Sequence, residues 1–314
     1  MLTKEEKEFR KNVIRALRLA NSVYFNETSR NLKISDIDSF ISLLNYRRKE
    51  FSKDIFKENY IELISSYIAL LACSKLSIGL ISSIKSKVKI FPLDFILEDN
   101  LPEPNFAFGT LFTLISNELL SIVNLILDGM EYPARPLIRS LNELCMLSIV
   151  LLSDPDKRKI YYSSQNFEDD RKNWYKYFTP AKLNDSILGL KNNFDLEQQI
   201  IINEYYNCNK HAQELYSQST HSTYINNFLG AYPNNIYDDN TRIYSIFGYP
   251  SKSAKNTLFY LFEFIHFTLS SVRLIIERQL NLKFPSVVEF NEFLVLEDIM
   301  YICMAHLYSK FKTA

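Results

Sequence analysis

The sequence predicts an all-α protein, a multi-helix bundle of about nine or ten helices. Apolar residues recur with helical spacing over most of the 314 residues. The chain has only 6 glycines, and signals for β-hairpins are scarce. The composition is 47% hydrophobic and 14% aromatic, so there is enough apolar surface to bury a large core.

Local signals place the ends of several helices. Ser35 and Asp36 are suitable N-cap residues for the second helix. Gly129 ends one helix, and the Asp154-Pro155 pair begins another, with proline at its first position. Residues 218–251 are rich in Asn, Tyr and Ser and predict a long loop. The predicted helices are 3–25, 35–50, 53–88, 105–130, 133–152, 155–177, 193–217, 252–281 and 286–311.

One interruption divides the chain. Prolines at positions 92, 102 and 104 disfavour helix between the third and fourth predicted helices. We therefore expect a linker at 91–104. It would join an N-terminal helical part at 1–90 to a C-terminal bundle at 105–314.

Composition excludes several classes of protein. With 36 basic and 36 acidic residues, the chain lacks the positive excess that broad nucleic-acid binding needs. It has neither of the glycine-rich motifs that cradle nucleotide phosphates. The four cysteines are far apart in apolar or helical runs, which indicates buried, reduced thiols in a cytosolic protein.

Long apolar stretches raise the question of a membrane. The stretch 63–84 has the length of a spanning helix, but Lys75 interrupts it and Glu62 and Lys85 flank it. The other apolar stretches carry charges near their middles, which lipid disfavours. The pattern favours core helices, so the expectation is a cytoplasmic protein with no membrane partner.

The most informative stretch follows Pro133. Arg135, Arg139 and Glu143 recur at spacings of four and share one face of an otherwise apolar helix. Two interpretations are open. Arg139 and Glu143 form a buried pair that locks two helices together, or Arg139 binds an anion at the wall of a site.

A second candidate lies where a long helix meets the polar loop. His221 stands in a cluster of Ser, Thr and Tyr residues, shortly after Tyr216 and Ser217. Such a histidine either orders the loop through hydrogen bonds or acts as a general acid or base.

These motifs support a resemblance to a known family. The pattern A-x-P-L-x-R-S-x-x-E, followed about 75 residues later by L-Y-S-x-x-x-H, resembles a bacterial family of uncharacterised helical proteins over about residues 105–280. The resemblance implies an all-helical bacterial domain that pairs Arg139 and Glu143 with the later His221. The family's activity is not established, so it implies no reaction.

The chain is more distantly similar to the HEPN superfamily of helical nucleotide-binding proteins and ribonucleases, which often serve in phage defence and toxin–antitoxin pairs. Their catalytic motif has an arginine four to six residues before a histidine, and His221 has none there. In a rearranged site, Arg139 would stabilise the phosphorane charge and His221 would act on the ribose 2′-hydroxyl.

Three functions follow as hypotheses: a metal-independent ribonuclease or nucleotide-binding defence protein, a non-enzymatic helical interaction protein, and a metal-binding bundle centred on Glu263 and His266. The first needs no cofactor and takes RNA or a nucleotide as its partner. A protein partner and a homodimer are also expected, because many aromatic residues leave apolar surface available. The proposed catalytic residues are Arg139, Glu143 and His221, and the substrate-binding residues are Arg135, Tyr216 and Ser217.

Overall fold

The computed structural model describes residues 3–24, 31–45, 51–84, 90–91, 103–164, 166–220 and 253–311. These residues form twelve α-helices and no strand, so the predicted all-α class is confirmed. The helices are α1 (Lys4–Tyr24), α2 (Ile34–Asn45), α3 (Phe51–Glu58), α4 (Tyr60–Ser83), α5 (Pro104–Leu127), α6 (Glu131–Ser153), α7 (Pro155–Tyr162), α8 (Phe167–Asn173), α9 (Pro180–Leu190), α10 (Leu196–Thr220), α12 (Ala254–Leu274) and α13 (Val288–Phe311). Short π-helical turns, η2 (Trp174–Phe178) and η4 (Ile275–Gln279), follow α8 and α12.

The helix count exceeds the prediction because two predicted helices are divided and one helix was missed. The predicted helix 53–88 is broken at Asn59, between α3 and α4. The predicted helix 155–177 is broken into α7, α8 and η2. The missed helix, α9, has a proline at its first position and buries Leu183, Ile187 and Leu190 on one side.

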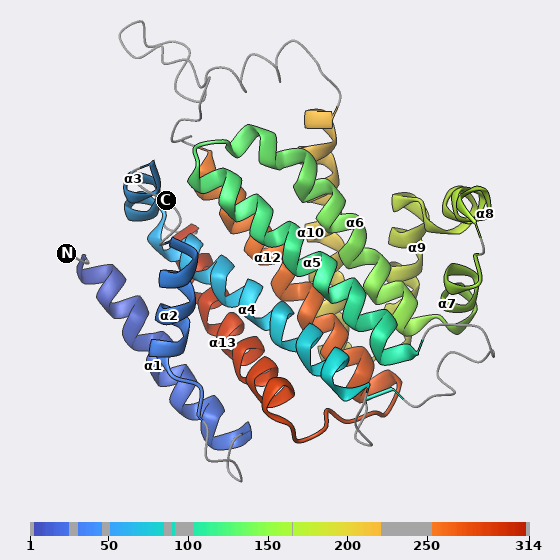
Figure 1. Ribbon diagram of the computed structural model, residues 1–314, viewed down its shortest axis with the longest axis horizontal. Helices are drawn as coiled ribbons and strands as arrows, with labels where there is room; N and C mark the ends of the chain where they lie inside the picture. Colours follow the sequence, from blue (N-terminus) through green and yellow to red (C-terminus); the bar gives the residue numbers. More distant parts are fainter. Residues whose placement is uncertain are drawn as a thin grey trace, which may run out of the picture.

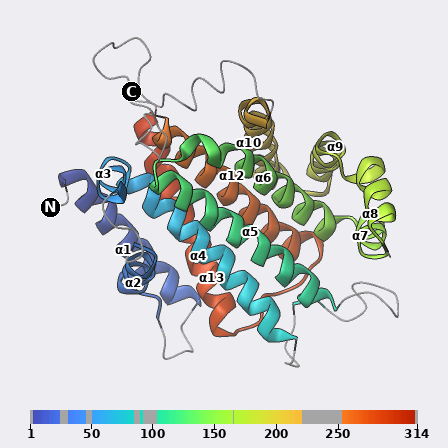
Figure 2. The same ribbon diagram turned by 45° about the horizontal axis from the view of Figure 1, so that its top comes forward.

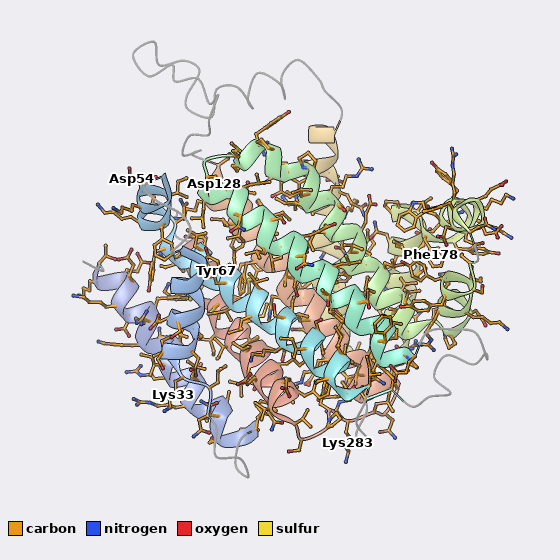
Figure 3. All side chains as sticks on the ribbon, viewed as in Figure 1. Lys33, Asp54, Tyr67, Asp128, Phe178 and Lys283 are labelled. Atoms are coloured by element: carbon orange, nitrogen blue, oxygen red, sulfur yellow. The ribbon has the colours of Figure 1, made fainter. Side chains whose placement is uncertain are left out.

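The main bundle has two layers (Figure 1). Helices α4, α5 and α6 run side by side in one layer, and α13, α12 and α10 lie behind them. α5 lies between α4 and α6 and has its main contacts with these two neighbours. The apolar faces of the two layers enclose the core, in which Tyr67 of α4 is fully buried (Figure 3).

Smaller elements flank the bundle on opposite sides (Figure 2). α1 and α2 lie on one side, and α1 packs along α13. α7, α8 and α9 form a lobe on the other side, where Phe178 is buried among aromatic rings of Tyr161, Trp174 and Tyr177. Asp154 caps α7 as expected, and its side chain accepts a hydrogen bond from the Lys157 backbone N–H at 3.0 Å.

The core is continuous across the predicted linker 91–104. α4 belongs to the predicted N-terminal part, yet its most extensive contacts are with α5 and α13. Phe91 is also buried, and its backbone exchanges hydrogen bonds with the side-chain amide of Asn105 at 3.0 and 3.2 Å. Residues on both sides of the linker therefore contribute to one core.

The expectation of a cytoplasmic protein without a membrane partner is wrong. Among the described residues, four helices are by length and composition able to cross a membrane: Tyr60–Ser83, Pro104–Leu127, Glu131–Ser153 and Ala254–Gln279. Their mean hydropathy over the best window lies between 1.4 and 1.7. Charged residues within these apolar stretches disfavour a location in lipid, but they are partly neutralised within the fold. Lys75 of α4, for example, forms an ion pair with the buried Glu292 of α13.

Candidate functional site

The structure brings two of the predicted substrate-binding residues to one end of the bundle. Arg135 donates to the buried Glu131 carboxylate through Nε at 2.9 Å and Nη2 at 3.3 Å. Tyr216 of α10 is also buried, and burial, with the nearby Glu131 carboxylate, raises its pKa. Glu131 also accepts hydrogen bonds from Ser253 at 3.0 Å and from Thr257 at the start of α12.

The residue that links helices here is therefore Glu131, which lies outside the predicted helix 133–152. Its carboxylate joins α6 to α12 through two hydroxyls and is held from its own helix by the fork of Arg135. The helix begins at Glu131 rather than at Pro133, so Glu131 and Arg135 have the i, i+4 relation that pairs them.

Arg139 and Glu143 form the expected ion pair, with Nε and Oε1 3.3 Å apart. Both belong to α6, so this pair lies along one helix and does not itself lock two helices together. Their side chains are 33% and 24% exposed, which leaves them accessible to a ligand. The neighbouring Ser140 donates to Glu118 of α5 at 3.1 Å.

The remaining predicted site residues cannot be placed beside this pair. Ser217 lies on α10, but its side chain is outside the described residues. His221 lies wholly outside them, as does the predicted loop 218–251 beyond Thr220. The proposed joint action of Arg139 and His221 therefore stays a prediction.

The metal-binding alternative finds no support in the part of the chain that is described. There, no group of three or more His, Cys, Asp and Glu residues converges to hold a metal ion. Glu263 instead accepts a hydrogen bond from the hydroxyl of Tyr308 on α13. The four cysteines are free and buried, as expected from their apolar surroundings.

The structure also contains a groove beside α12 that the sequence did not predict. It has a volume of about 780 Å³ and lies between α10, α12 and α13. His266, Phe267, Ser270, Arg273 and Glu277 line it from α12 and η4, because spacings of three and four place them on one helix face. Residues of α10 and α13 form the two walls, among them Ile200, Ile201, Tyr301, Met304 and Tyr308.

A charge network forms part of the lining of this groove. Arg273 donates through Nη1 to Glu297 at 2.6 Å and to Asp298 at 2.8 Å, and Ser270 donates to Glu297 at 2.6 Å. The other guanidinium nitrogen, Nη2, donates to the hydroxyl of Tyr24 on α1. Burial raises the pKa of Tyr24 to about 12 and also raises the pKa of Asp298.

His266 is the most unusual group in the groove. It is 4% exposed, and its Nδ1 is buried without a hydrogen-bond partner. Its ring lies among those of Phe262, Phe267 and Tyr301, with centroids 5.0 to 6.5 Å away. Burial lowers its pKa to about 4, so the imidazole is neutral near pH 7 and offers one donor and one acceptor.

Sequence signals for this groove were present but scattered over distant segments. Glu297 and Asp298 interrupt the apolar run of α13, and Arg273 interrupts that of α12. Buried charges of opposite sign predict a pair, but nothing in the sequence says which helices meet. Comparison with known proteins adds no guidance, since no family model, curated protein or solved structure matches the chain.

Proposed function

We propose that the chain is a helical ligand-binding protein whose site is the groove between α10, α12 and α13. The observation that carries the proposal is His266, a buried imidazole with an unpartnered nitrogen at the wall of a 780 Å³ groove. An unpaired buried polar atom is unfavourable, and a ligand removes that cost if the ring of His266 turns this nitrogen toward the groove. The volume is in the range of small-molecule sites.

The lining favours a ligand with a positive charge. Four carboxylates line the groove, those of Glu197, Glu277, Glu297 and Asp298, against the two guanidinium groups of Arg273 and Arg278. His266 adds no charge while it is neutral. The local field is therefore negative and favours a cation.

The other part of the lining favours an apolar body. Phe267, Tyr301 and Tyr308 contribute aromatic surface, and Ile200 and Tyr301 are largely exposed. Aromatic faces attract cations as well as apolar groups. The ligand class that fits is an amphipathic organic cation with a hydrogen-bonding group for His266.

Binding of three matched probes tests this function: 2-phenylethylamine, 2-phenylethanol and 3-phenylpropanoate. By calorimetry, the amine should bind more tightly than the neutral alcohol, and the carboxylate should bind least. Asp298→Asn should weaken binding of the amine by about three-fold or more, because it removes one negative charge from the groove. Asp156→Asn, the same change at an exposed position of α7, should have no effect. Equal affinity for all three probes would contradict the proposal.

The ribonuclease-type function predicted from the sequence stays a separate hypothesis. The accessible Arg139–Glu143 pair is compatible with it. Incubation of the protein with a mixed RNA pool, beside folded Arg139→Ala and His221→Ala variants, tests it directly. Cleavage by the wild type alone would support the nuclease. Absence of cleavage by all three would remove the hypothesis and leave the groove as the site.

A further inference from the structure

The outer surface of α4 and α5 has no exposed charge within the two helices and exposes four large apolar side chains, those of Ile78, Ile81, Phe106 and Leu114. Exposed residues follow one stripe of α5 and the C-terminal half of α4. We call this surface the α4–α5 face, and its exposed residues are Ile78, Ile81, Ser82, Phe106, Thr110, Leu114, Asn117 and Ser121.

The two stripes form one continuous surface. The Ser77 hydroxyl donates to the Gly109 carbonyl at 2.9 Å and lies 2.6 Å from the Thr113 hydroxyl, so the helices touch there. Gly109 permits this approach, because a Cβ at that position would lie 2.7 Å from Ile81. Ile78 and Ile81 of α4 are thereby placed beside the exposed stripe of α5.

Charge is nearly absent from these two helices. In α4 and α5 the charged residues are Glu62, Lys75 and Glu118. Glu62 is buried near Lys255, Lys75 pairs with Glu292, and Glu118 accepts from Ser140. None of these charges is exposed in the stripe, which runs along α5 from Phe106 to Ser121, about 22 Å.

We propose that the α4–α5 face docks on the hydrocarbon boundary of a lipid bilayer. Its two helices have the highest mean hydropathy of the four that could span a membrane, 1.7 each, and half of the α5 window is not buried inside the bundle. A protein partner is a poorer match, because the stripe lacks the Tyr, Trp and Arg residues that anchor most protein interfaces. Large exposed apolar surfaces of this kind mark membrane or protein interaction sites.

The rest of the bundle favours lying on the bilayer over crossing it. α1 runs alongside α13 (Figures 1 and 2), and its outer side is charged along its length. The exposed charged residues there are Lys4, Glu5, Lys7, Glu8, Lys11, Arg15 and Arg18. A bilayer that enclosed the bundle would also enclose this side, at a cost of several kcal/mol for each charge. Docking through the α4–α5 face leaves the charged outer side of α1 in water.

Flotation of the purified protein with phosphatidylcholine vesicles tests the proposal. The wild type should float with the vesicles and stay bound in 0.5 M salt, because the face is uncharged. Leu114→Asp and Ile78→Asp should each reduce the bound fraction by about ten-fold, since each places a charge on the face. Leu19→Asp, at a position on α1 that is 72% exposed, is the matched control and should float like the wild type.

Four results would overturn the proposal or part of it. The first is a wild type that does not float. The second is an equal loss of flotation in Leu19→Asp and Leu114→Asp. The third is a wild-type dimer that becomes monomeric in Leu114→Asp without any vesicle binding, which would assign the face to a second copy of the chain. Resistance of the bound protein to extraction at pH 11 would show insertion across the bilayer and overturn the flat orientation.

Discussion

Arg273 forms ion pairs with two acidic residues of α13 in the lining of the groove. Glu297 is buried and Asp298 is partly buried, so both depend on the guanidinium between them. Arginine suits this position because its nitrogens can reach several acceptors at once. The side chain positions α13 against α12 and thereby shapes the groove.

Replacement of this arginine should be costly. Arg273→Met leaves the carboxylates of Glu297 and Asp298 without their guanidinium, and we expect a loss of about 3 kcal/mol or more in unfolding free energy at pH 7. Denaturant unfolding measures it. Arg278→Met, which removes an exposed arginine five residues later, should change stability by less than about 0.5 kcal/mol. Similar losses in both variants would mean that the network has no stabilising role.

For single residues, the sequence identified charged side chains that pair along one helix but did not identify their contacts on other helices. Arg135, Arg139 and Glu143 were recognised from their spacing, and two ion pairs of α6 were found there. Glu131 was missed because the helix was predicted to begin at Pro133, and Asp298 was missed because its partner Arg273 lies on another helix. The spacing of residues in the sequence predicts which side chains are neighbours on one helix, but it does not predict contacts between helices.

Close packing between helices depends on Gly79 but not on Gly189. At Gly79 of α4, an added Cβ would lie 2.5 Å from the ring of Phe290 on α13. At Gly189 of α9, an added Cβ would meet nothing within 4 Å. The same residue type therefore has a packing role in one helix and none in the other.

This contrast gives a matched pair of substitutions. Gly79→Ala should destabilise the protein by about 1 to 3 kcal/mol, because the ring of Phe290 must move. Gly189→Ala should stabilise it by about 0.5 kcal/mol, since alanine is the better helix former and meets no obstacle. Thermal unfolding of both variants checks the opposite signs. Equal shifts in the same direction would contradict the close approach of α4 and α13.

At the element scale most helices were predictable and their breaks were not. The long apolar periods of α4, α5, α6 and α13 identified these helices directly. The break between α3 and α4 at Asn59 escaped because apolar residues continue on both sides of it. The π-helical turns at η2 and η4 also have no simple sequence signal.

For the whole molecule, the single core makes the helices interdependent. α4 is enclosed by α5, α12 and α13, all of which follow the predicted linker. The proline-rich composition of 91–104 indicated an interruption of helix, but composition does not show whether the flanking parts share a core.

Separate expression of the predicted N-terminal part tests this interdependence. The fragment 1–90 should lack a cooperative thermal transition by circular dichroism, because α4 would expose the apolar faces that α5 and α13 cover. The full chain should show one. A fragment that unfolds cooperatively at a similar temperature would establish an independent domain at 1–90.

The wall of the groove contains a neutral, buried imidazole with an unpaired nitrogen, that of His266. Its pKa is lowered to about 4 by burial, so the unfolded chain takes up a proton first as pH falls from 6.5. This histidine should therefore reduce folding stability progressively between about pH 6.5 and pH 4, and His266→Gln should be less affected.

The most direct test is the titration of His266 by NMR of histidine labelled with ¹⁵N, with its signals assigned through His266→Gln. We predict that the signals stay those of a neutral ring between pH 7 and pH 5, and that the midpoint lies near pH 4. Addition of 2-phenylethylamine at pH 7 should shift the ring nitrogens. A midpoint near 6.5, with no response to the amine, would mean that the imidazole is solvated and that the groove is not the site.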